Sequence, residues 1–239
     1  MKNAYKRIII KLSGEALADK SGNTILDHEK LQGVAKVIKD ALATGTEIGV
    51  VVGAGNIWRG RLADKIGIEA STADYMGMLG TIMNALAVQS ALEEIGLKCR
   101  VMSAINVPQV CEPYIRRKAM HHMEKGIVTI FAGGTGNPYF TTDSCATLRA
   151  LETGCDAILM GKNGVDGIYD KDPRTNPDAK IIKSLSFREL VERKLGVMDL
   201  TAAALLENKK VVVHVFNMND PENLIRVLQG EEIGSIIHD

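Results

Sequence analysis

The sequence is poor in aromatic residues, in net charge and in long apolar runs. Phe, Trp and Tyr make up 4% of its 239 residues, which disfavours the base-stacking surfaces of single-strand nucleic-acid binders. Lys plus Arg and Asp plus Glu both number 29, so no bulk charge attracts nucleic acid or a membrane surface. No segment approaches the roughly 18 apolar residues of a membrane span, and the N-terminal isoleucine run is too short for a signal peptide. We expect a cytoplasmic protein that requires neither nucleic acid nor a membrane.

Cysteine and histidine do not form a recognisable metal-binding pattern. The four cysteines are Cys99, Cys111, Cys145 and Cys155, and no two are spaced as C-x-x-C. Cys99 and Cys155 begin apolar runs, which is typical of small buried residues. The five histidines form no ligand set. This use of cysteine indicates a reducing compartment, and we assign no side chain as a metal ligand.

Strand-like runs alternate with helical patterns along most of the chain. We predict strands at 5–12, 47–53, 98–104, 127–133, 156–161 and 211–217, with a final edge strand at 234–239. We predict helices at 28–45, 74–95, 113–126, 144–154, 186–195, 200–210 and 221–230, and a hairpin or long loop at 165–180. This alternation predicts an α/β fold, a three-layer sandwich whose mainly parallel sheet is covered by helices on both faces. We expect a single domain over 1–239, with a softer boundary near 161–165.

Four glycine-bearing segments follow predicted strands, at 12–14, 53–60, 133–136 and 161–167. Ligands of open α/β sheets bind outside the carboxyl ends of the strands. All four segments are therefore expected at one edge of the sheet. Their convergence predicts a ligand site there more strongly than any one of them does alone.

Two basic residues near these glycines are candidates for phosphate binding. Lys11 interrupts an apolar strand just before Ser13 and Gly14, which fits either a lysine reaching out from a strand end or a phosphate-binding lysine. Glycines 53, 55 and 60 do not have dinucleotide-fold spacing. They fit a phosphate turn with Arg59 as its partner, or a structural turn with a surface arginine.

Three further positions have both an ordinary and a functional interpretation. Asp74 could be the N-cap of the following helix, or it could accept hydrogen bonds from a ribose. That helix is apolar nearly all round, which indicates core or a subunit interface. Lys162 follows a strand and could be a second phosphate lysine. Tyr169 and Asp172 could flank a base and its ribose, or be ordinary loop residues.

Five segments together resemble one known family. In order and spacing, "KLSGEAL", "GAGNIWRG", "ADYMGMLGTIMNAL", "GGTGNPYFTTD" and "NGVDGIYDKDP" are similar to the bacterial uridylate kinases of the amino acid kinase superfamily. The resemblance covers essentially the whole chain. It is specific, because "GGTGNPYFTTD" together with "ADYMGML" is not shared by the amino-acid and carbamate kinases of the superfamily.

The resemblance implies two nucleotide sites. The residues implied for ATP are Lys11, Leu12, Ser13, Gly14, Gly55, Arg59, Asn163, Tyr169 and Asp172. Those implied for UMP are Ala54, Asp74, Thr135, Gly136, Asn137, Pro138, Tyr139, Phe140, Thr141 and Thr142. Residues 1–160 would then form the acceptor half and 161–239 the ATP-nucleoside half.

The resemblance also implies cofactors, partners and control. It implies Mg²⁺ carried with ATP, a homohexamer, a place in pyrimidine nucleotide biosynthesis, feedback inhibition by UTP and activation by GTP. Two departures bear on this. Ala54 stands between Gly53 and Gly55 where the family commonly has three glycines, which is tolerable if the alanine keeps a negative φ. The 18–27 segment is less glycine-rich than in many members, which weakens the expectation of GTP activation.

The sequence offers no obvious general base, and this is consistent with phosphate as the acceptor. A phosphomonoester has a second pKa of about 6 and is mostly dianionic near neutrality. Catalysis would then be positioning and charge neutralisation. We expect Lys11, Lys162 and Arg59 to act on phosphate, and Asp143 to hold the lysines in place. Alternatives are a carboxylate or carbamate kinase of the same superfamily, a non-catalytic UMP- or UTP-binding regulator and, more distantly, a dinucleotide oxidoreductase.

Overall fold

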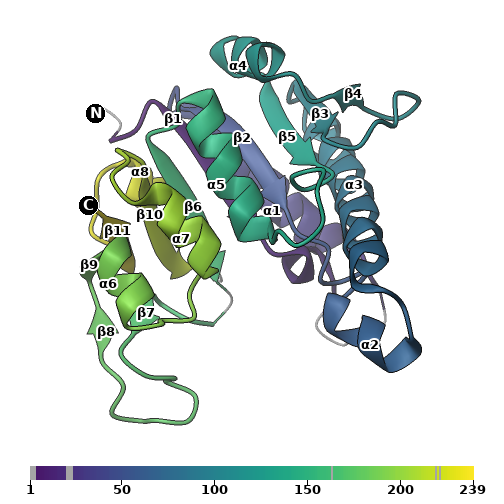
Figure 1. The fold of residues 1–239 in the computed structure, drawn as a ribbon. Helices are drawn as coiled ribbons and strands as arrows, with labels where there is room; N and C mark the ends of the chain where they lie inside the picture. The colour runs from purple at the N-terminus through teal and green to yellow at the C-terminus, as the bar shows by residue number, and fades with distance from the viewer. Residues whose placement is uncertain (1–3, 20–23, 163, 219, 221) are drawn as a thin grey trace.

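A mainly parallel sheet lies at the centre of the molecule (Figure 1). The computed structural model describes residues 4–19, 24–162, 164–218, 220 and 222–239. Among them, nine strands form one sheet in the order β4-β3-β5-β2-β1-β6-β10-β11-β9. Their bounds are β1 (Arg7–Leu12), β2 (Glu47–Val52), β3 (Cys99–Ser103), β4 (Glu112–Pro113), β5 (Val128–Ala132), β6 (Ala157–Lys162), β9 (Ser184–Ser186), β10 (Val212–Asn217) and β11 (Ser235–His238). Only the β10–β11 pair among these is antiparallel.

Helices cover both faces of this sheet. Their bounds are α1 (His28–Ala43), α2 (Ala63–Ile66), α3 (Ala70–Glu94), α4 (Arg116–Glu124), α5 (Thr142–Thr153), α6 (Phe187–Glu192), α7 (Leu200–Leu206) and α8 (Glu222–Leu228), with short 3₁₀ turns at Gly14–Leu17 and Gly60–Leu62. One core cluster joins the sheet to α1, α3 and α8, and the other joins it to α4, α5, α6 and α7. The predicted three-layer α/β sandwich is confirmed.

The central strand shows why the sheet needs cover on both sides. In β1, Ile8 and Ile10 pack into the first core cluster, while Ile9 between them packs into the second. Side chains alternate between faces along a strand. A continuous isoleucine run therefore buries apolar surface on both faces, and all three residues are at most 1% exposed.

The strand register brings the four glycine segments to one edge, as predicted. Leu12 pairs with Val52, Lys11 with Met160, and Val51 with Phe131. Strands β5, β2, β1 and β6 are adjacent and parallel, so their carboxyl ends lie side by side.

Several predicted boundaries were wrong. Helix α3 begins at Ala70, four residues before the predicted start, because Glu69 caps it by accepting from the backbone N–H groups of Ser71 and Thr72. Asp74 therefore lies inside the helix and is not its N-cap. The helix predicted at 113–126 begins only at Arg116, since Pro113 belongs to β4. The last strand is confirmed, but it is not an edge strand, because β9 pairs with its outer side.

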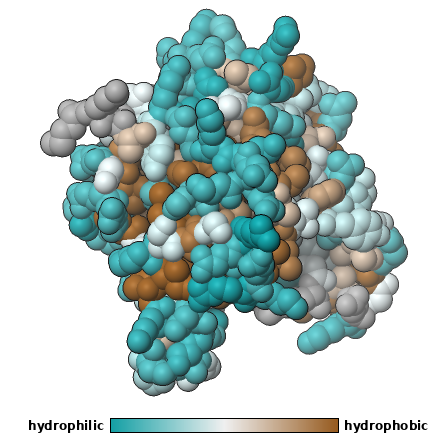
Figure 2. Space-filling model, turned by 60° about the vertical axis from the view of Figure 1, so that its left-hand side comes forward, coloured by the Kyte–Doolittle hydropathy of each residue, from teal (hydrophilic) through white to brown (hydrophobic). Residues whose placement is uncertain are grey.

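The predicted hairpin at 165–180 is present as a small separate sheet. Strands β7 (Ile168–Tyr169) and β8 (Ile181–Ile182) pair antiparallel. In Figure 2 the loop between them is a hydrophilic projection at the bottom of the molecule. Within the described residues, no helix combines the length and apolar character needed to span a membrane.

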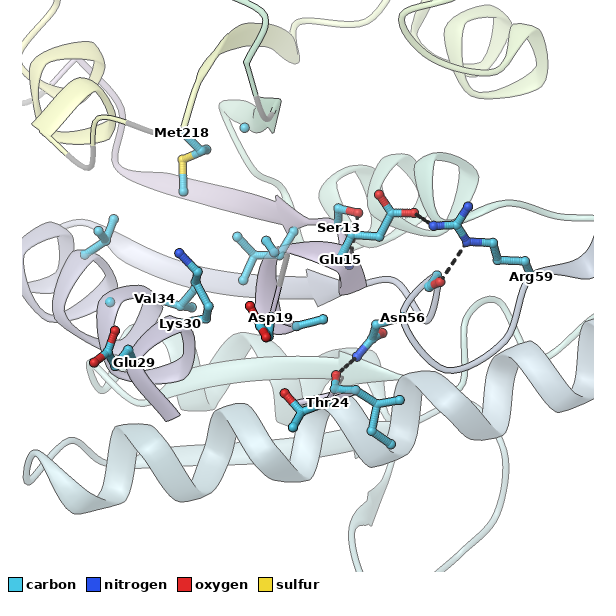
Figure 3. A pocket seen from close by; sticks show the side chains of 18 residues that line it. Ser13, Glu15, Asp19, Thr24, Glu29, Lys30, Val34, Asn56, Arg59 and Met218 are labelled. Carbon is cyan, nitrogen blue, oxygen red and sulfur yellow. Dashed lines mark hydrogen bonds and ion pairs between the residues drawn. The ribbon is translucent and has the colours of Figure 1, made fainter. Parts of the chain in front are cut away.

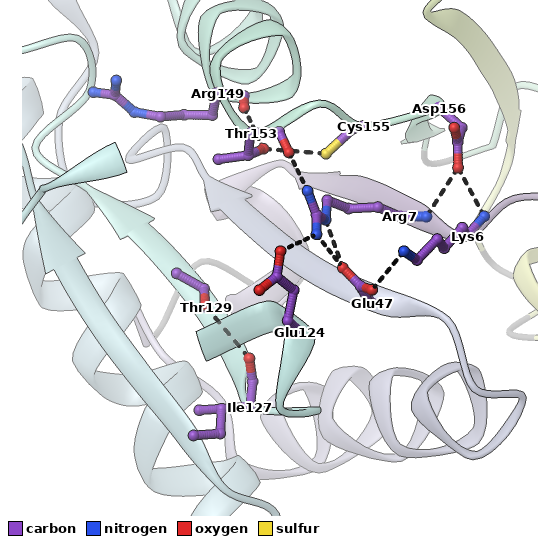
Figure 4. Close-up of polar contacts among 10 residues, drawn as sticks. All are labelled: Lys6, Arg7, Glu47, Glu124, Ile127, Thr129, Arg149, Thr153, Cys155 and Asp156. Carbon is purple, nitrogen blue, oxygen red and sulfur yellow. Dashed lines mark hydrogen bonds and ion pairs between the residues drawn. The ribbon is translucent and has the colours of Figure 1, made fainter. Parts of the chain in front are cut away.

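A buried arginine joins four elements at the opposite edge of the sheet (Figure 4). Arg7 donates to the Glu47 carboxylate at 2.6 Å, to the carbonyl oxygen of Thr153, and to Glu124 at 3.3 Å. Asp156 accepts from the backbone N–H of Arg7 at 3.0 Å. These bonds fix the start of β1 against β2, α4, α5 and the segment before β6.

Candidate functional site

Two cavities open at the glycine-bearing edge. The larger, about 820 Å³, is bordered by the segments after β1, β2 and β10, by the end of β6 and by α1 (Figure 3). The smaller, about 240 Å³, lies among the segments after β2 and β5 and helices α3 and α5. Gly55 lines both cavities. The turn after β2 therefore separates two adjoining spaces, an arrangement suited to two ligands that must meet.

The close approach of two turns at this edge requires a glycine. A Cβ placed on Gly14 would lie 2.6 Å from the carbonyl oxygen of Gly53 and 2.3 Å from Oδ1 of Asn56. Any side chain at position 14 would push the turn after β1 away from the turn after β2. Backbone groups of both turns thus remain within reach of one ligand.

One carboxylate at the strand ends pairs with one lysine and acts electrostatically on a second. Lys11 Nζ lies 2.8 Å from Asp143 Oδ1, and the two side chains are 14% and 16% exposed. Lys162 Nζ donates to the carbonyl oxygen of Val197 at 2.8 Å. Burial lowers the pKa of Lys162, the charge of Lys11 lowers it further, and Asp143 opposes both effects. Two ammonium groups against one carboxylate leave an excess of positive charge for an anionic ligand.

Asp143 is fixed in place by the start of α5, where its neighbours contact Asp199, a residue that was not predicted from the sequence. Thr141 caps α5, because its hydroxyl oxygen accepts from the backbone N–H groups of Asp143 and Ser144. The same hydroxyl donates to Asp199, which also accepts from the Ser144 hydroxyl at 3.0 Å. Asp199 in turn caps α7 by accepting from the N–H of Ala202. An aspartate just before a predicted helix was the only signal for it.

Arg59 lies at the rim of the larger cavity. Its guanidinium donates to the Gly55 carbonyl oxygen at 3.1 Å and forms an ion pair with Glu15 (Figure 3). The Arg59 side chain is 42% exposed. It therefore bridges the segments after β1 and β2 and remains accessible to an anion. Glu15, its partner, was not singled out from the sequence.

Asp74 contacts the segment after β5. Its carboxylate accepts from the backbone N–H of Tyr139 at 2.7 Å, and Tyr139 has a φ of 70°. Of the loop residues predicted for the acceptor, Phe140, Thr141 and Thr142 line the smaller cavity together with Ala54 and Asp74. Thr135, Gly136, Asn137, Pro138 and Tyr139 are not among the lining residues.

Two of the remaining predicted positions, Tyr169 and Asp172, lie apart from this arrangement. Asn163 is outside the described residues, as are residues 20–23 of the 18–27 segment. Tyr169 belongs to β7 and Asp172 to the loop after it. Hydrogen bonds from the Arg174 guanidinium and backbone lower the pKa of the Asp172 carboxyl. Neither Tyr169 nor Asp172 lines the two cavities.

The described residues contain no group of three or more His, Cys, Asp or Glu side chains that could hold a metal ion. Mg²⁺ commonly binds through substrate phosphates and keeps several waters, with one or two protein carboxylates at most. The positively charged site therefore fits a metal that arrives on a polyphosphate. The arrangement suits phosphoryl transfer, because it offers cationic side chains and backbone turns close together.

Comparisons with known proteins agree with this geometry. The model of the amino acid kinase family matches residues 6–217. The chain is 53% identical to the uridylate kinase of Rubrobacter xylanophilus, over 97% of this chain and 91% of that protein, and 50% identical to that of Deinococcus radiodurans, over 98% and 95%.

Solved structures show the same fold. The UMP kinase from Bacillus anthracis superposes with a TM-score of 0.95 at 42% identity, covering 98% of this chain and 96% of that one. The UMP kinase from Ureaplasma parvum superposes with a TM-score of 0.92 at 39% identity, covering 98% and 99%.

Proposed function

The chain belongs to the amino acid kinase family, within its uridylate kinases, and from this premise we propose that it transfers the γ-phosphoryl group of ATP to UMP. The products are UDP and ADP. The observation that carries the proposal is the Lys11–Asp143 pair, with Lys162 electrostatically coupled to it, next in sequence to Leu12 and Gly161 of the larger cavity and to Thr142 of the adjoining smaller one. A phosphoryl group in transfer passes between such adjoining sites.

The two cavities suggest how the substrates divide. UMP occupies the smaller cavity, with its phosphate near the backbone of Ala54, its ribose near Asp74 and its base against the loop at 135–142, of which Phe140, Thr141 and Thr142 line the cavity. ATP occupies the larger cavity, which Leu12, Ser13 and Gly55 line, and places its phosphates along these residues and Gly14. Its nucleoside reaches toward Asn163, Tyr169 and Asp172. Residues 1–160 thus supply the acceptor half of a single domain, and 161–239 supply the ATP-nucleoside half.

The residues carry out the reaction by neutralising charge. The attacking oxygen belongs to the UMP phosphate, which is mostly a dianion near neutrality because its second pKa is about 6. It needs no general base. Lys11 and Lys162 stabilise the charge on the transferred group, and Arg59 holds phosphate at the rim. Asp143, in its ion pair with Lys11, orients the cations.

Mg²⁺ bound to the ATP phosphates would supply further charge neutralisation. The chain contributes no assigned metal ligand. The proposal extends to a homohexamer in the cytoplasm that serves pyrimidine nucleotide biosynthesis, with inhibition by UTP and a weaker case for activation by GTP. Support for these properties comes from the family resemblance.

The test is an assay of ADP release with UMP and Mg-ATP, with and without UTP and GTP. Parallel reactions offer CMP, N-acetylglutamate, aspartate and carbamate as acceptors. UMP is expected to be the preferred acceptor. Preference for a carboxylate or carbamate would indicate another kinase of the superfamily, and UMP binding without ADP release would indicate a regulator.

A Lys11→Ala substitution tests the central residue. We expect kcat to fall by two or more orders of magnitude, roughly the effect of losing one electrostatic contact to the transition state, while UMP affinity stays nearly intact. Lys36→Ala, which removes an exposed lysine of α1, should leave kcat unchanged. An unchanged kcat in the Lys11 variant would refute the assignment. For Asp143→Asn, activity lost at neutrality and regained at high pH would identify a true base.

A further inference from the structure

Two buried polar side chains of α3 each hold one of the glycine turns that border the smaller cavity. They are Thr81, which is 8% exposed, and Asn84, which is 0% exposed. Thr81 contacts the turn after β5, and Asn84 contacts the turn after β2. Buried polar groups in an otherwise apolar helix are costly unless they are hydrogen-bonded. The hydrogen-bond partners of Thr81 and Asn84 therefore indicate what these two side chains do.

Asn84 supports the turn after β2. Its amide nitrogen donates to the carbonyl oxygen of Gly53 at 2.7 Å and to Oδ1 of Asn56 at 2.8 Å. Its amide oxygen accepts from the Asn56 amide at 3.1 Å, so the two side chains form a reciprocal pair. The Gly53 N–H is bonded to Leu12. Asn84 therefore binds the Gly53 carbonyl oxygen just beyond the last paired residues of β1 and β2, and it also binds the Asn56 side chain. These contacts fix both ends of the short turn from Gly53 to Asn56.

Thr81 supports the turn after β5. Its hydroxyl oxygen accepts from the backbone N–H of Gly133 at 2.9 Å and donates to the carbonyl oxygen of Met78 at 2.7 Å. Gly133 and Gly134 have φ values of 71° and 57°, a left-handed conformation that favours glycine. The Gly133 carbonyl oxygen accepts from the N–H of Gly136 within the turn, whereas the Gly133 N–H is bonded to Thr81, which anchors the start of the following loop to α3.

The helix makes the two supports rigid with respect to each other. Positions three apart lie on the same side of an α-helix, less than one turn apart. We propose that Thr81 and Asn84 are positioning residues that set the separation of the two turns across the acceptor cavity. The inference rests on the proposed function, in which those turns hold the phosphate and the base of UMP.

Substitutions of Thr81 and of Asn84 should change different Michaelis constants, because the turns that the two residues hold border different cavities. The turn after β5 lines only the smaller cavity, whereas Gly55 in the turn after β2 lines both. Loss of the Thr81 hydroxyl should therefore raise KM for UMP alone. Loss of the Asn84 amide should raise KM for both substrates. A purely structural role would lower the melting temperature or the active fraction and leave both KM values unchanged.

The experiment measures KM for UMP and ATP, kcat and melting temperature in Thr81→Val, Thr81→Ser and Asn84→Ala. For Thr81→Val we expect KM for UMP to rise about tenfold, the size of one buried hydrogen bond, and KM for ATP to change less than twofold. Thr81→Ser keeps the hydroxyl and should restore KM for UMP. Thr147→Val is the matched control, because Thr147 is fully buried in α5 and its hydroxyl has no described hydrogen-bond partner.

Unchanged KM for UMP in a folded Thr81→Val enzyme would overturn the inference, as would an equal rise in the Thr147 control. If neither Thr81→Val nor Asn84→Ala folds, Asn56→Ala tests the same turn from its accessible side. We expect this variant to raise KM for both substrates, and unchanged KM values would again overturn the inference. A wild-type enzyme that releases no ADP with UMP would instead refute the proposed function.

Discussion

At the scale of single residues, the charge balance around Lys162 is the feature that pH can probe. Burial and the neighbouring Lys11 lower its pKa, and only Asp143 opposes them. A lysine with a lowered pKa loses its proton at a lower pH than an exposed lysine does. In the proposed mechanism the protonated form stabilises phosphate, so activity should be lost from the alkaline side.

We predict that kcat/KM for ATP falls at lower pH than kcat does. The first reports the free enzyme and the second the enzyme with substrate bound. Bound polyphosphate favours the charged lysine and raises its pKa, which moves the alkaline limit of kcat upward. In Lys162→Arg the guanidinium stays protonated, so the residual activity should lose this alkaline decline. Steady-state pH profiles of both enzymes check the prediction, and coincident alkaline limits of kcat and kcat/KM in the wild type would contradict it.

At the scale of elements, the methyl group of Ala54, in the turn after β2, packs closely against Gly80 of helix α3. A Cβ on Gly80 of α3 would lie 2.9 Å from the Cβ of Ala54. Ala54 is not among the described residues with positive φ, so the condition expected from the sequence is met. Its methyl group, in place of a family glycine, fits because α3 carries a glycine opposite. Position 54 and position 80 are therefore sterically coupled.

This coupling predicts a compensating pair of substitutions. Gly80→Ala should overpack the contact and lower stability by about 1–3 kcal/mol, with a rise in KM for UMP. Adding Ala54→Gly should recover most of the loss, with a coupling energy of about 0.5–3 kcal/mol. Urea unfolding of the two single variants and the double variant measures this. Gly33→Ala in α1 is the control, because a Cβ there meets nothing within 4 Å, and strictly additive effects at 54 and 80 would argue against the coupling.

At the scale of the whole molecule, the two ends of the parallel strands, which form the carboxyl edge and the amino edge of the sheet, have different roles. The carboxyl edge carries the cavities and the lysine pair. The amino edge carries Arg7, which is 7% exposed and bonded to Glu47, Glu124 and Thr153. This cluster lies far along the strands from the site, since Arg7 begins β1 and Lys11 is near its end. It is expected to stabilise the fold without contacting substrate.

We predict that Arg7→Ala lowers the free energy of unfolding by about 3–5 kcal/mol, because it leaves buried acceptors and a carboxylate without their partner. The KM values for UMP and ATP should stay within twofold of the wild type in the folded fraction. Lys6→Ala is the control, because Lys6 is 78% exposed and contacts the same Glu47 at 3.7 Å. A large change in either KM would show that the amino edge also shapes the site.

The long β-branched strands and the glycine segments after them were predictable, because local pattern decides them. Short elements such as β4 and β9 were not, since two or three residues carry no periodic signal. The start of α3 was missed because Ser71 and Thr72 look like loop residues until Glu69 caps them. Asp143 was expected beside the lysines, and it forms an ion pair with Lys11. Asp199, Thr81 and Asn84 were missed, because their partners are distant in sequence.

The sequence by itself determined the layers, the mainly parallel direction of the strands and the edge at which a ligand would bind, because hydrophobic period and glycine placement are local properties. Tertiary structure alone decided which charges meet. Lys11 and Asp143 are 132 positions apart, and their 2.8 Å contact exists only because β1 ends where α5 begins. Likewise, Thr81 and Asn84 gain a role only once α3 lies against two turns from other parts of the chain.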